Sequence, residues 1–239
     1  MLVLGVDSSC KTAAVAVMHD GKILSELNSG GNISHSENLL PMVDYALKVA
    51  GVRAEDIELF AVANGPGSFT GIRIGVATIK GLAFAESLCG DGGANCVGVS
   101  SLQALAYNFE IAGGGMMLQD LIILPVIDAR RRQVYNAVFD DALEYIERER
   151  VITLDELECE LNLKYAGKRV IFTGDGAELC YREINFDGKL EVPAILKKPS
   201  AGALCMAALR EYNSGAISAA ELAPAYLMKT QAEREYNAK

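Results

Sequence analysis

The sequence lacks the features that mark several large classes of protein. None of its 6 cysteines forms a C-x-x-C pair, which argues against a zinc site or a thioredoxin-like redox motif. No apolar run approaches the roughly 20 residues of a membrane-spanning helix, and the N-terminus reaches Asp7 before a signal-peptide core could form. We therefore expect reduced core cysteines in a cytoplasmic protein without membrane contact.

Positive charge and histidine are also scarce. Lysine and arginine number 22 against 31 aspartates and glutamates, so the net charge is −9. Because binding to a phosphate backbone is mainly cationic, this chain alone is not expected to hold nucleic acid, although it could join a complex that does. Of the two histidines, His19 adjoins Asp20-Gly21, a pair that predicts a type I′ hairpin turn, and should face solvent.

His35 stands before Ser36 and Glu37 and has two interpretations. It could belong to a catalytic triad, or it could mark a helix start with Ser34 or Ser36 as the cap and Glu37 near the positive end of the helix dipole. No G-x-S-x-G nucleophile elbow appears in the sequence, so the helix start is favoured.

The most informative segment covers residues 64–75 and reads N-G-P-G-S-F-T-G-I-R-I-G. An apolar strand pattern precedes it, and a helical pattern over residues 76–88 follows. Its structural residues are Gly65, Pro66, Gly67 and Gly71. Glycine adopts backbone angles that other residues avoid and proline stiffens a turn, so a tight strand-to-helix loop is predicted. The segment matches neither the Walker motif nor the dinucleotide-binding fingerprint.

Two series of elements with the same plan follow one another along the chain. The predicted strands are 2–6, 13–18, 22–27, 56–63 and 95–99, then 121–127, 133–139, 143–151 and 169–173. The predicted helices are 36–50, 76–88 and 102–111, then 154–160, 177–182 and 199–212. Each series reads β-β-β-α-β-α, which predicts an α/β protein with two mixed sheets. Gly113, Gly114 and Gly115 are the clearest linker signal. We expect a first lobe at 1–112 and a second, degenerate lobe at 113–239, whose last helical tail could pack back on the first.

This plan resembles the two-lobed actin-like ATPase (RNase H-like) fold, in which two such lobes face each other across a nucleotide cleft. In that fold an aspartate ends the first strand of each lobe, and Asp7 and Asp128 match these positions. The resemblance implies the nucleotide-facing residues Asp7, Ser8, Ser9, Asp128, Gly174, Asp175 and Gly176. The alternative is that these aspartates are turn residues that bond their own backbone.

Working members of that fold place glycines directly after each aspartate, because a β-carbon keeps backbone N–H groups away from phosphate oxygens. Here Asp7 is followed by Ser8-Ser9-Cys10, and Asp128 is followed by Ala129 and residues 130–132, which are three arginines. We therefore expect no nucleotide bound tightly by this chain alone, with ATP or ADP held only in a complex. The arginines could contact RNA phosphate or form a solvated hairpin turn.

Four motifs resemble the TsaB family, which was earlier labelled glycoprotease-like. They are G-P-G-S-F-T-G-I-R-I-G at 65–75, V-D-S-S at 6–9, I-D-A-R-R-R-Q-V-Y at 127–135 and P-A-Y-L at 224–227. The resemblance covers essentially the whole chain. TsaB is a paralogue of TsaD, the subunit that transfers a threonylcarbamoyl group to the adenosine at position 37 of tRNA.

TsaD carries a metal-binding H-x-x-x-H motif just after its fifth strand, and here Ser101 and Leu105 occupy the matching positions. A serine and a leucine cannot replace two imidazole ligands, so neither a metal nor catalytic residues are expected. The resemblance implies a subunit that dimerises with TsaD and activates it, supports docking of the ATPase TsaE, forms a homodimer when alone, and meets tRNA only through the complex. The alternatives are an actin-fold ATPase or phosphotransferase using Asp7 and Asp128, and a metallopeptidase acting on its own.

In the family the first-lobe helices form a helical bundle with the partner. The implied interface residues are Leu39, Leu40, Met42, Val43, Ala46, Leu47, Gly71, Gly75, Thr78, Leu82 and Ala85. The residues of the second helix follow i, i+4, i+7 spacing, and small side chains there would allow close approach of another helix. Burial of both helices within their own lobe explains the same pattern.

Overall fold

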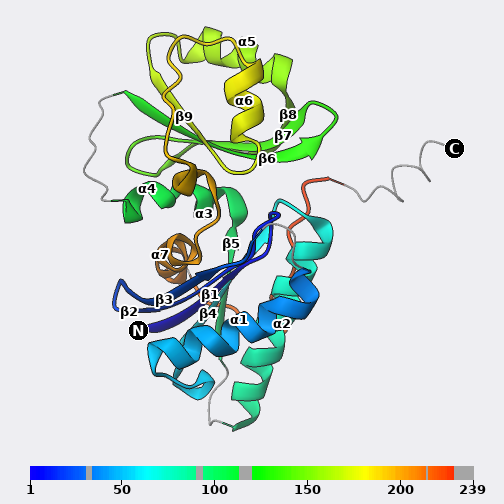
Figure 1. The fold of residues 1–239 in the computed structure, drawn as a ribbon, viewed down its shortest axis with the longest axis vertical. Coiled ribbons are helices and arrows are strands. Elements are labelled where there is room, and N and C mark those ends of the chain that lie inside the picture. Colours follow the sequence, from blue (N-terminus) through cyan, green and yellow to red (C-terminus); the bar gives the residue numbers. More distant parts are fainter. Residues whose placement is uncertain (31–33, 90–93, 113–119, 214, 229–239) are drawn as a thin grey trace, which may run out of the picture.

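The computed structural model describes residues 1–30, 34–89, 94–112, 120–213 and 215–228, and their strands form two sheets (Figure 1). The strands of the first sheet are β1 (Leu2–Asp7), β2 (Ala14–His19), β3 (Lys22–Asn28), β4 (Leu59–Gly65) and β5 (Asn95–Ser100). The strands of the second are β6 (Leu121–Arg130), β7 (Gln133–Phe139), β8 (Tyr145–Thr153) and β9 (Arg169–Thr173). The helices are α1 (His35–Ala50), α2 (Phe69–Cys89), α3 (Ser101–Ala106), α4 (Asn108–Ile111), α5 (Leu154–Lys164), α6 (Ala177–Glu183) and α7 (Ala201–Tyr212), with 3₁₀ turns η1 (Ala54–Asp56) and η2 (Ala194–Lys197).

The first sheet has the strand order β3-β2-β1-β4-β5 and is mixed. Its β1–β2 and β2–β3 pairs are antiparallel, whereas β1–β4 and β4–β5 are parallel. Successive side chains of a strand point to opposite faces, so Leu4 of β1 packs with α1 and α2 while Val3 packs with α7. The sheet is therefore covered on both faces.

The second sheet has the order β8-β7-β6-β9 and repeats the first without a fifth strand among the described residues. One face packs on α5 and α6 through a core that includes Val126, Leu157 and Phe172. The other face turns toward the first lobe. These two mixed sheets with their helices confirm the predicted α/β class and the two-lobed architecture.

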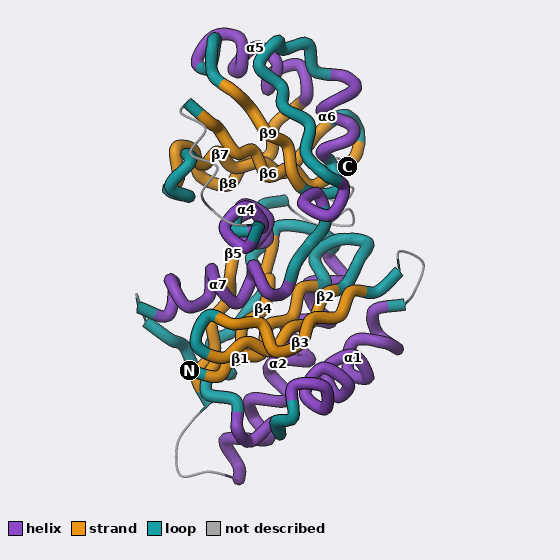
Figure 2. The backbone as a smooth tube through the Cα atoms, turned by 60° about the vertical axis from the view of Figure 1, so that its left-hand side comes forward, coloured by secondary structure: helices purple, strands orange, loops and turns teal. Residues whose placement is uncertain are grey.

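The lobes meet around α3, whose six residues are all buried. Leu102 and Leu105 belong to the core of the second sheet, while Ala104 packs with α7 and the first sheet. Figures 1 and 2 show α4 and α7 between the two sheets. Helix α7 follows the second lobe in sequence, yet it packs on β1 and β2. The division at residue 112 stays a prediction, and the Gly113–Gly115 linker lies outside the described residues.

Several element boundaries differ from the sequence prediction. Helix α2 begins at Phe69 rather than at residue 76, so Gly71 and Gly75 lie inside a helix and not in a loop. The predicted helix over 102–111 is divided into α3 and α4. Asp20 and Gly21 have φ angles of 47° and 75°, which fit the predicted type I′ hairpin turn. No helix in the described ranges combines the length and the apolar content that crossing a membrane requires.

Candidate functional site

A cleft of about 500 Å³ lies between the lobes, where the actin-like plan places a nucleotide. The first lobe lines it with residues 9–11, His35 and residues 66–69, the second with residues 127–130, Tyr135 and Asp175, and the tail with residues 225–228. Ser9, Asp128 and Asp175 of the predicted set line the cleft directly. Asp7 is completely buried and does not line it, although Ser9, which bonds to the Asp7 carboxyl, does.

Asp7 ends β1 and is completely buried. Its Oδ1 atom accepts hydrogen bonds from the Ser9 backbone N–H at 2.8 Å and from the Ser9 hydroxyl at 2.7 Å, whereas its Oδ2 atom is buried without a partner among the described residues. Burial raises the pKa of the Asp7 carboxyl. The Ser9 bonds and His35 oppose this rise, and the charge of Asp175 adds to it.

The turn after Asp7 is fastened to the glycine motif. The Ser8 hydroxyl donates to Gly71 O at 2.8 Å, and the Ser68 N–H donates to Ser9 O at 2.7 Å. A β-carbon at Gly71 would overlap Ser8 O, and one at Gly67, where φ is 154°, would overlap Ser9 O. These glycines therefore allow two backbone segments of the same lobe to touch, and this contact explains the motif without a phosphate.

The remaining structural residues of the motif border the tail and the cleft. Gly65 is the last residue of β4 and lies against the backbone of Ala225, and Pro66 lines the cleft. Gly75 lies in α2 against the side chain of Ser8. The 64–75 segment thus holds three parts of the chain together: β4, the β1–β2 turn and the tail.

In the second lobe, the backbone N–H groups near the end of β6 also donate to atoms of the chain itself. The Asp128 N–H donates to Asp175 Oδ1 at 3.1 Å, and the Arg130 N–H donates to Asp128 Oδ1 at 2.8 Å. The Gly176 N–H donates to Val126 O at 3.1 Å, and Gly174, with a φ of 100°, packs against the same carbonyl. Burial raises the pKa of Asp175, the hydrogen bond from Asp128 lowers it, and the Asp128 charge raises it.

The two positions that correspond to the TsaD histidines lie in the interlobe core. Ser101 and Leu105 are completely buried, and Leu105 packs with the second sheet. The Ser101 hydroxyl has no hydrogen-bond partner among the described residues. Within those residues, no group of three or more His, Cys, Asp or Glu side chains is placed to hold a metal ion.

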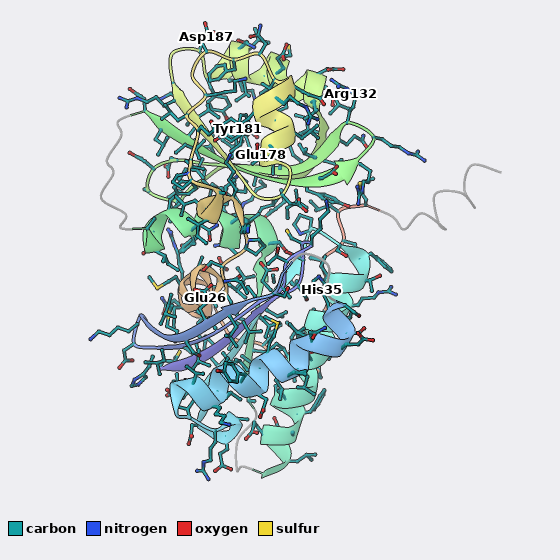
Figure 3. All side chains as sticks on the ribbon, in the orientation of Figure 1. Glu26, His35, Arg132, Glu178, Tyr181 and Asp187 are labelled. Carbon is teal, nitrogen blue, oxygen red and sulfur yellow. The ribbon has the colours of Figure 1, made fainter. Side chains whose placement is uncertain are left out.

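His35 lines the cleft, a position that sequence reasoning missed. It is the first residue of α1, and Figure 3 places it where the lobes meet. Its Nε2–H donates to Cys10 O at 2.9 Å, and its Nδ1 is buried without a partner among the described residues. Ser34 is the N-cap residue, although its hydroxyl bonds to Ser36 and not to the helix backbone. His19 has a side chain 54% exposed, near Asp20.

An aromatic pair, with Tyr226 from the P-A-Y-L motif and Phe69 from the glycine motif, forms another wall of the cleft. Tyr226 stacks on Phe69 with ring centroids 4.8 Å apart, and the Arg73 Nε–H donates to the Tyr226 hydroxyl at 2.7 Å. The Ala225 N–H donates to Asn64 O at 2.7 Å. Sequence reasoning quoted this motif only as a resemblance. The motif bonds to β4 and α2, which are far away in the sequence, so no local sequence pattern indicates these contacts.

The predicted partner-interface residues fall into two groups. Leu39, Val43, Ala46 and Leu47 are buried in the core of their own lobe, as are Gly71 and Gly75. Met42, Thr78 and Leu82 are partly buried, and Leu40 and Ala85 are exposed. Burial within the lobe accounts for the first group, so only the second can contribute surface to an interface.

Two mixed sheets around a cleft, with an aspartate at the end of β1 and another near the end of β6, define a two-lobed protein of the actin-like fold. The family model described as TsaD, tRNA N6-adenosine threonylcarbamoyltransferase, matches residues 31–236. The chain is 31% identical over 183 residues to the tRNA threonylcarbamoyladenosine biosynthesis protein TsaB of Bacillus subtilis, covering 75% of this chain and 73% of that protein. The chain therefore belongs to the TsaD family and, within it, to the TsaB group.

Further comparisons agree with this assignment. TsaB of Haemophilus influenzae is 28% identical over 238 residues, covering 95% of this chain and 93% of that protein. The structure titled YeaZ from Pseudomonas aeruginosa has a TM-score of 0.76 at 26% identity and covers 95% of this chain and 99% of that one. Ethanolamine utilization protein EutJ from Carboxydothermus hydrogenoformans has a TM-score of 0.53 at 10% identity, covers 86% of this chain and 90% of that one, and shows the fold alone.

Proposed function

We propose that this chain takes part in tRNA threonylcarbamoyladenosine biosynthesis as a non-catalytic subunit. In this role it pairs with a TsaD-type transferase through its first-lobe helices, activates it and supports docking of TsaE. Without that partner it pairs with a second copy of itself. Membership in the TsaB group supports the pathway, and the buried Ser101 and Leu105 support a role without metal chemistry.

The observation that carries the pairing is a set of large apolar side chains that are exposed on α1 and α2. They are Leu40, Tyr45, Val49, Phe84 and Leu88. Figures 1 and 2 show α1 and α2 side by side beneath the first sheet. Leu88 is 88% exposed and Leu40 is 56% exposed. Large apolar side chains exposed on neighbouring helices favour a partner surface over solvent.

The small residues of α2 fit the same role. Ala77, Gly81 and Ala85 are exposed near Phe84, and a β-carbon at Gly81 would meet no other atom within 4 Å. Such a surface lets a partner helix approach closely. Leu39 and Val43 cannot serve as interface probes, because both are 1% exposed and a charge there would disrupt the core.

The test is co-purification of this chain with the TsaD-type transferase of the same cell. Phe84→Glu and Leu88→Glu together should abolish the complex, because a carboxylate in a desolvated apolar contact is costly. Leu163→Glu is the matched control, since Leu163 is 78% exposed on α5 in the other lobe and should leave binding intact.

Urea unfolding of each variant separates loss of pairing from loss of fold. Equal stability of both variants together with loss of the complex only in the α2 variant would support the proposal. If the complex survives both substitutions in α2, the interface lies elsewhere on the protein. Metal-dependent peptide cleavage or ATP turnover by the purified chain would favour one of the two enzyme alternatives.

A further inference from the structure

Helix α2 carries an arginine that two aromatic rings and a hydrogen bond hold in place. The guanidinium carbon of Arg73 lies 3.8 Å from the centroid of the Phe69 ring, one turn earlier in the same helix. The Arg73 Nε–H donates to the Tyr226 hydroxyl at 2.7 Å, and the Tyr226 ring stacks on Phe69. Because these contacts already restrict the side chain, a further contact with it costs little additional entropy.

The outer edge of this guanidinium is unused. Arg73 is exposed, and within the described part of the chain its two terminal nitrogens have neither a hydrogen-bond acceptor nor a carboxylate partner. Arg150 shows the contrast, because both of its terminal nitrogens donate to the carboxylate of Glu160. The free edge of Arg73 is a planar fork of N–H donors, which matches the geometry of a carboxylate or a phosphate.

Arg73 shares a face of α2 with exposed apolar side chains. Ala77, Phe84 and Leu88 follow it after about one, three and four helical turns, so all of them point in similar directions. Ala77 is exposed, Phe84 is 46% exposed and Leu88 is 88% exposed. This face therefore has a fixed arginine near its N-terminal end and large apolar side chains near its C-terminal end.

The surroundings of Arg73 favour a carboxylate of a protein over a phosphate of RNA. Binding to a phosphate backbone requires several cations, and the chain has a net charge of −9. The other cation of α2, Lys80, already donates to the carbonyl oxygens of Ala220 and Leu222 in the tail. A single arginine beside apolar side chains is instead typical of the energetic centre of a protein interface.

We propose that Arg73 anchors the pairing surface by binding a carboxylate side chain of the transferase subunit through its terminal N–H groups. This inference rests on the proposed function, because it takes the transferase as the partner of the α2 face. Phe84 and Leu88 would exclude water from the contact, and an ion pair in such a setting is stronger than one exposed to solvent. Tyr226 is a positioning residue, since it holds Nε and leaves the outer edge free.

The test measures the dissociation constant of the complex between the full-length chain and the transferase at low and at high salt concentration. Arg73→Ala should weaken the complex about tenfold at low salt and less at high salt, because it removes an ion pair. Arg73→Lys should restore only part of the affinity, since an ammonium group lacks the planar fork. Arg169→Ala is the matched control, because Arg169 is exposed on β9 in the other lobe and should not affect binding.

A double-mutant cycle tests the positioning role of Tyr226. Tyr226→Phe keeps the ring on Phe69 and removes the hydroxyl that holds Arg73, so the complex should weaken about threefold. In the Arg73→Ala background the same substitution should change nothing, because no guanidinium remains to be positioned. A merely structural role of the hydroxyl would instead weaken binding equally in both backgrounds and would contradict the positioning role.

Urea unfolding checks that each variant keeps its fold. If Arg73→Ala binds as tightly as the parent while Phe84→Glu with Leu88→Glu abolishes the complex, the proposed function stands and the arginine anchor is wrong. If the complex survives both sets of substitutions, both proposals fail. Weaker pairing with a second copy alone, or weaker tRNA binding by a complex that still assembles normally, would assign Arg73 to another contact and overturn the inference.

Discussion

The two lobes share an order of strands, yet they use the turn after the first strand in opposite ways. In the first lobe, Ser8 and Ser9 are completely buried beneath the glycine motif. In the second lobe, residues 130–132 are exposed, and their φ angles are 69°, 53° and 57°. The two lobes therefore share an order of elements but not the burial of the residues in this turn. One turn became part of a core, and the other stayed at the surface beside the cleft.

The lobes also differ in how they complete their sheets. Within the part of the chain that the structure describes, the first sheet has five strands and helices on both faces, and one of these helices is α7 from the far end of the chain. The second has four strands there, and its inner face packs on α3 and on residues before α7. The second lobe thus contributes a helix to the first and receives α3 in its own core.

The largest expected effect tests the buried turn. Gly71→Ala should lower the free energy of unfolding by about 3 kcal/mol or more, because the new methyl group overlaps backbone at Ser8. Gly176→Ala in the second lobe should cost about 1 kcal/mol or less, since its methyl group would lie 3.2 Å from Val126 O. Urea denaturation measures both. Equal costs would remove the distinction between the two turns.

The next effect concerns the shared core. Leu105→Ala should destabilise by about 3 kcal/mol, because the side chain is completely buried and leaves a cavity between the lobes. Since α3 packs on both sheets, calorimetry should still record one transition for the variant, at a lower temperature. Two separate transitions would mean that the lobes unfold independently and that α3 does not join them.

A smaller effect follows from the aspartates at the two turns. Burial raises the pKa of Asp7 above its usual 3.8, so the folded state binds a proton more tightly than the unfolded state. The resulting stabilisation is complete below the usual pKa and is lost as pH rises through the folded pKa. Asp7→Asn should therefore gain stability over the parent between acidic and neutral pH in urea denaturation.

Asp128→Asn is the control for that measurement. The Asp128 side chain is 32% exposed and lies 3.6 Å from Arg130, so its replacement removes a weak ion pair and should give a slight loss. If Asp7→Asn is also less stable than the parent at neutral pH, burial of the charged carboxyl does not destabilise the protein. The two turns would then respond in the same way to loss of their aspartate charge.

The smallest effect belongs to the exposed turn. Arg131→Gly should raise the free energy of unfolding by about 0.5–1 kcal/mol, because Arg131 has a left-handed φ that glycine tolerates better. A Gly81→Ala variant gives a comparable gain for the opposite reason, since Gly81 lies within α2 and a methyl group there meets nothing. Loss of stability in Arg131→Gly would show that the arginine side chain contributes contacts of its own.

Local patterns were enough to predict most of the fold. Short apolar runs and the Asp20-Gly21 turn predicted β1, β2 and β3, and the repeated plan predicted two mixed sheets. The start of α2 was missed because glycine at residues 71 and 75 disfavours a helix, whereas packing on Ser8 outweighs that preference.

The residues that line the cleft were harder to predict from the sequence than the fold. Asp128 and Asp175 line the cleft, and the repeated plan had indicated both positions, one near the end of the first strand of the second lobe and the other in the turn after β9. His35 and Tyr226 were not predicted there, because each reaches the cleft only through contacts with residues far away in the chain. The amphipathic pattern of α1 also could not separate the buried Leu39 from the exposed Leu40 as an interface residue.

The position of α7 has a consequence for how the protein is made. During synthesis, the strands of the first sheet leave the ribosome long before residues 201–212 do. Until then, the β1–β2 surface that α7 later covers has no cover, and its Val3, Ala14, Ala16 and Met18 remain open to water or to a chaperone. A gene fragment ending near residue 112 would leave that surface bare permanently, so this fragment should not be obtainable as a stable product by itself.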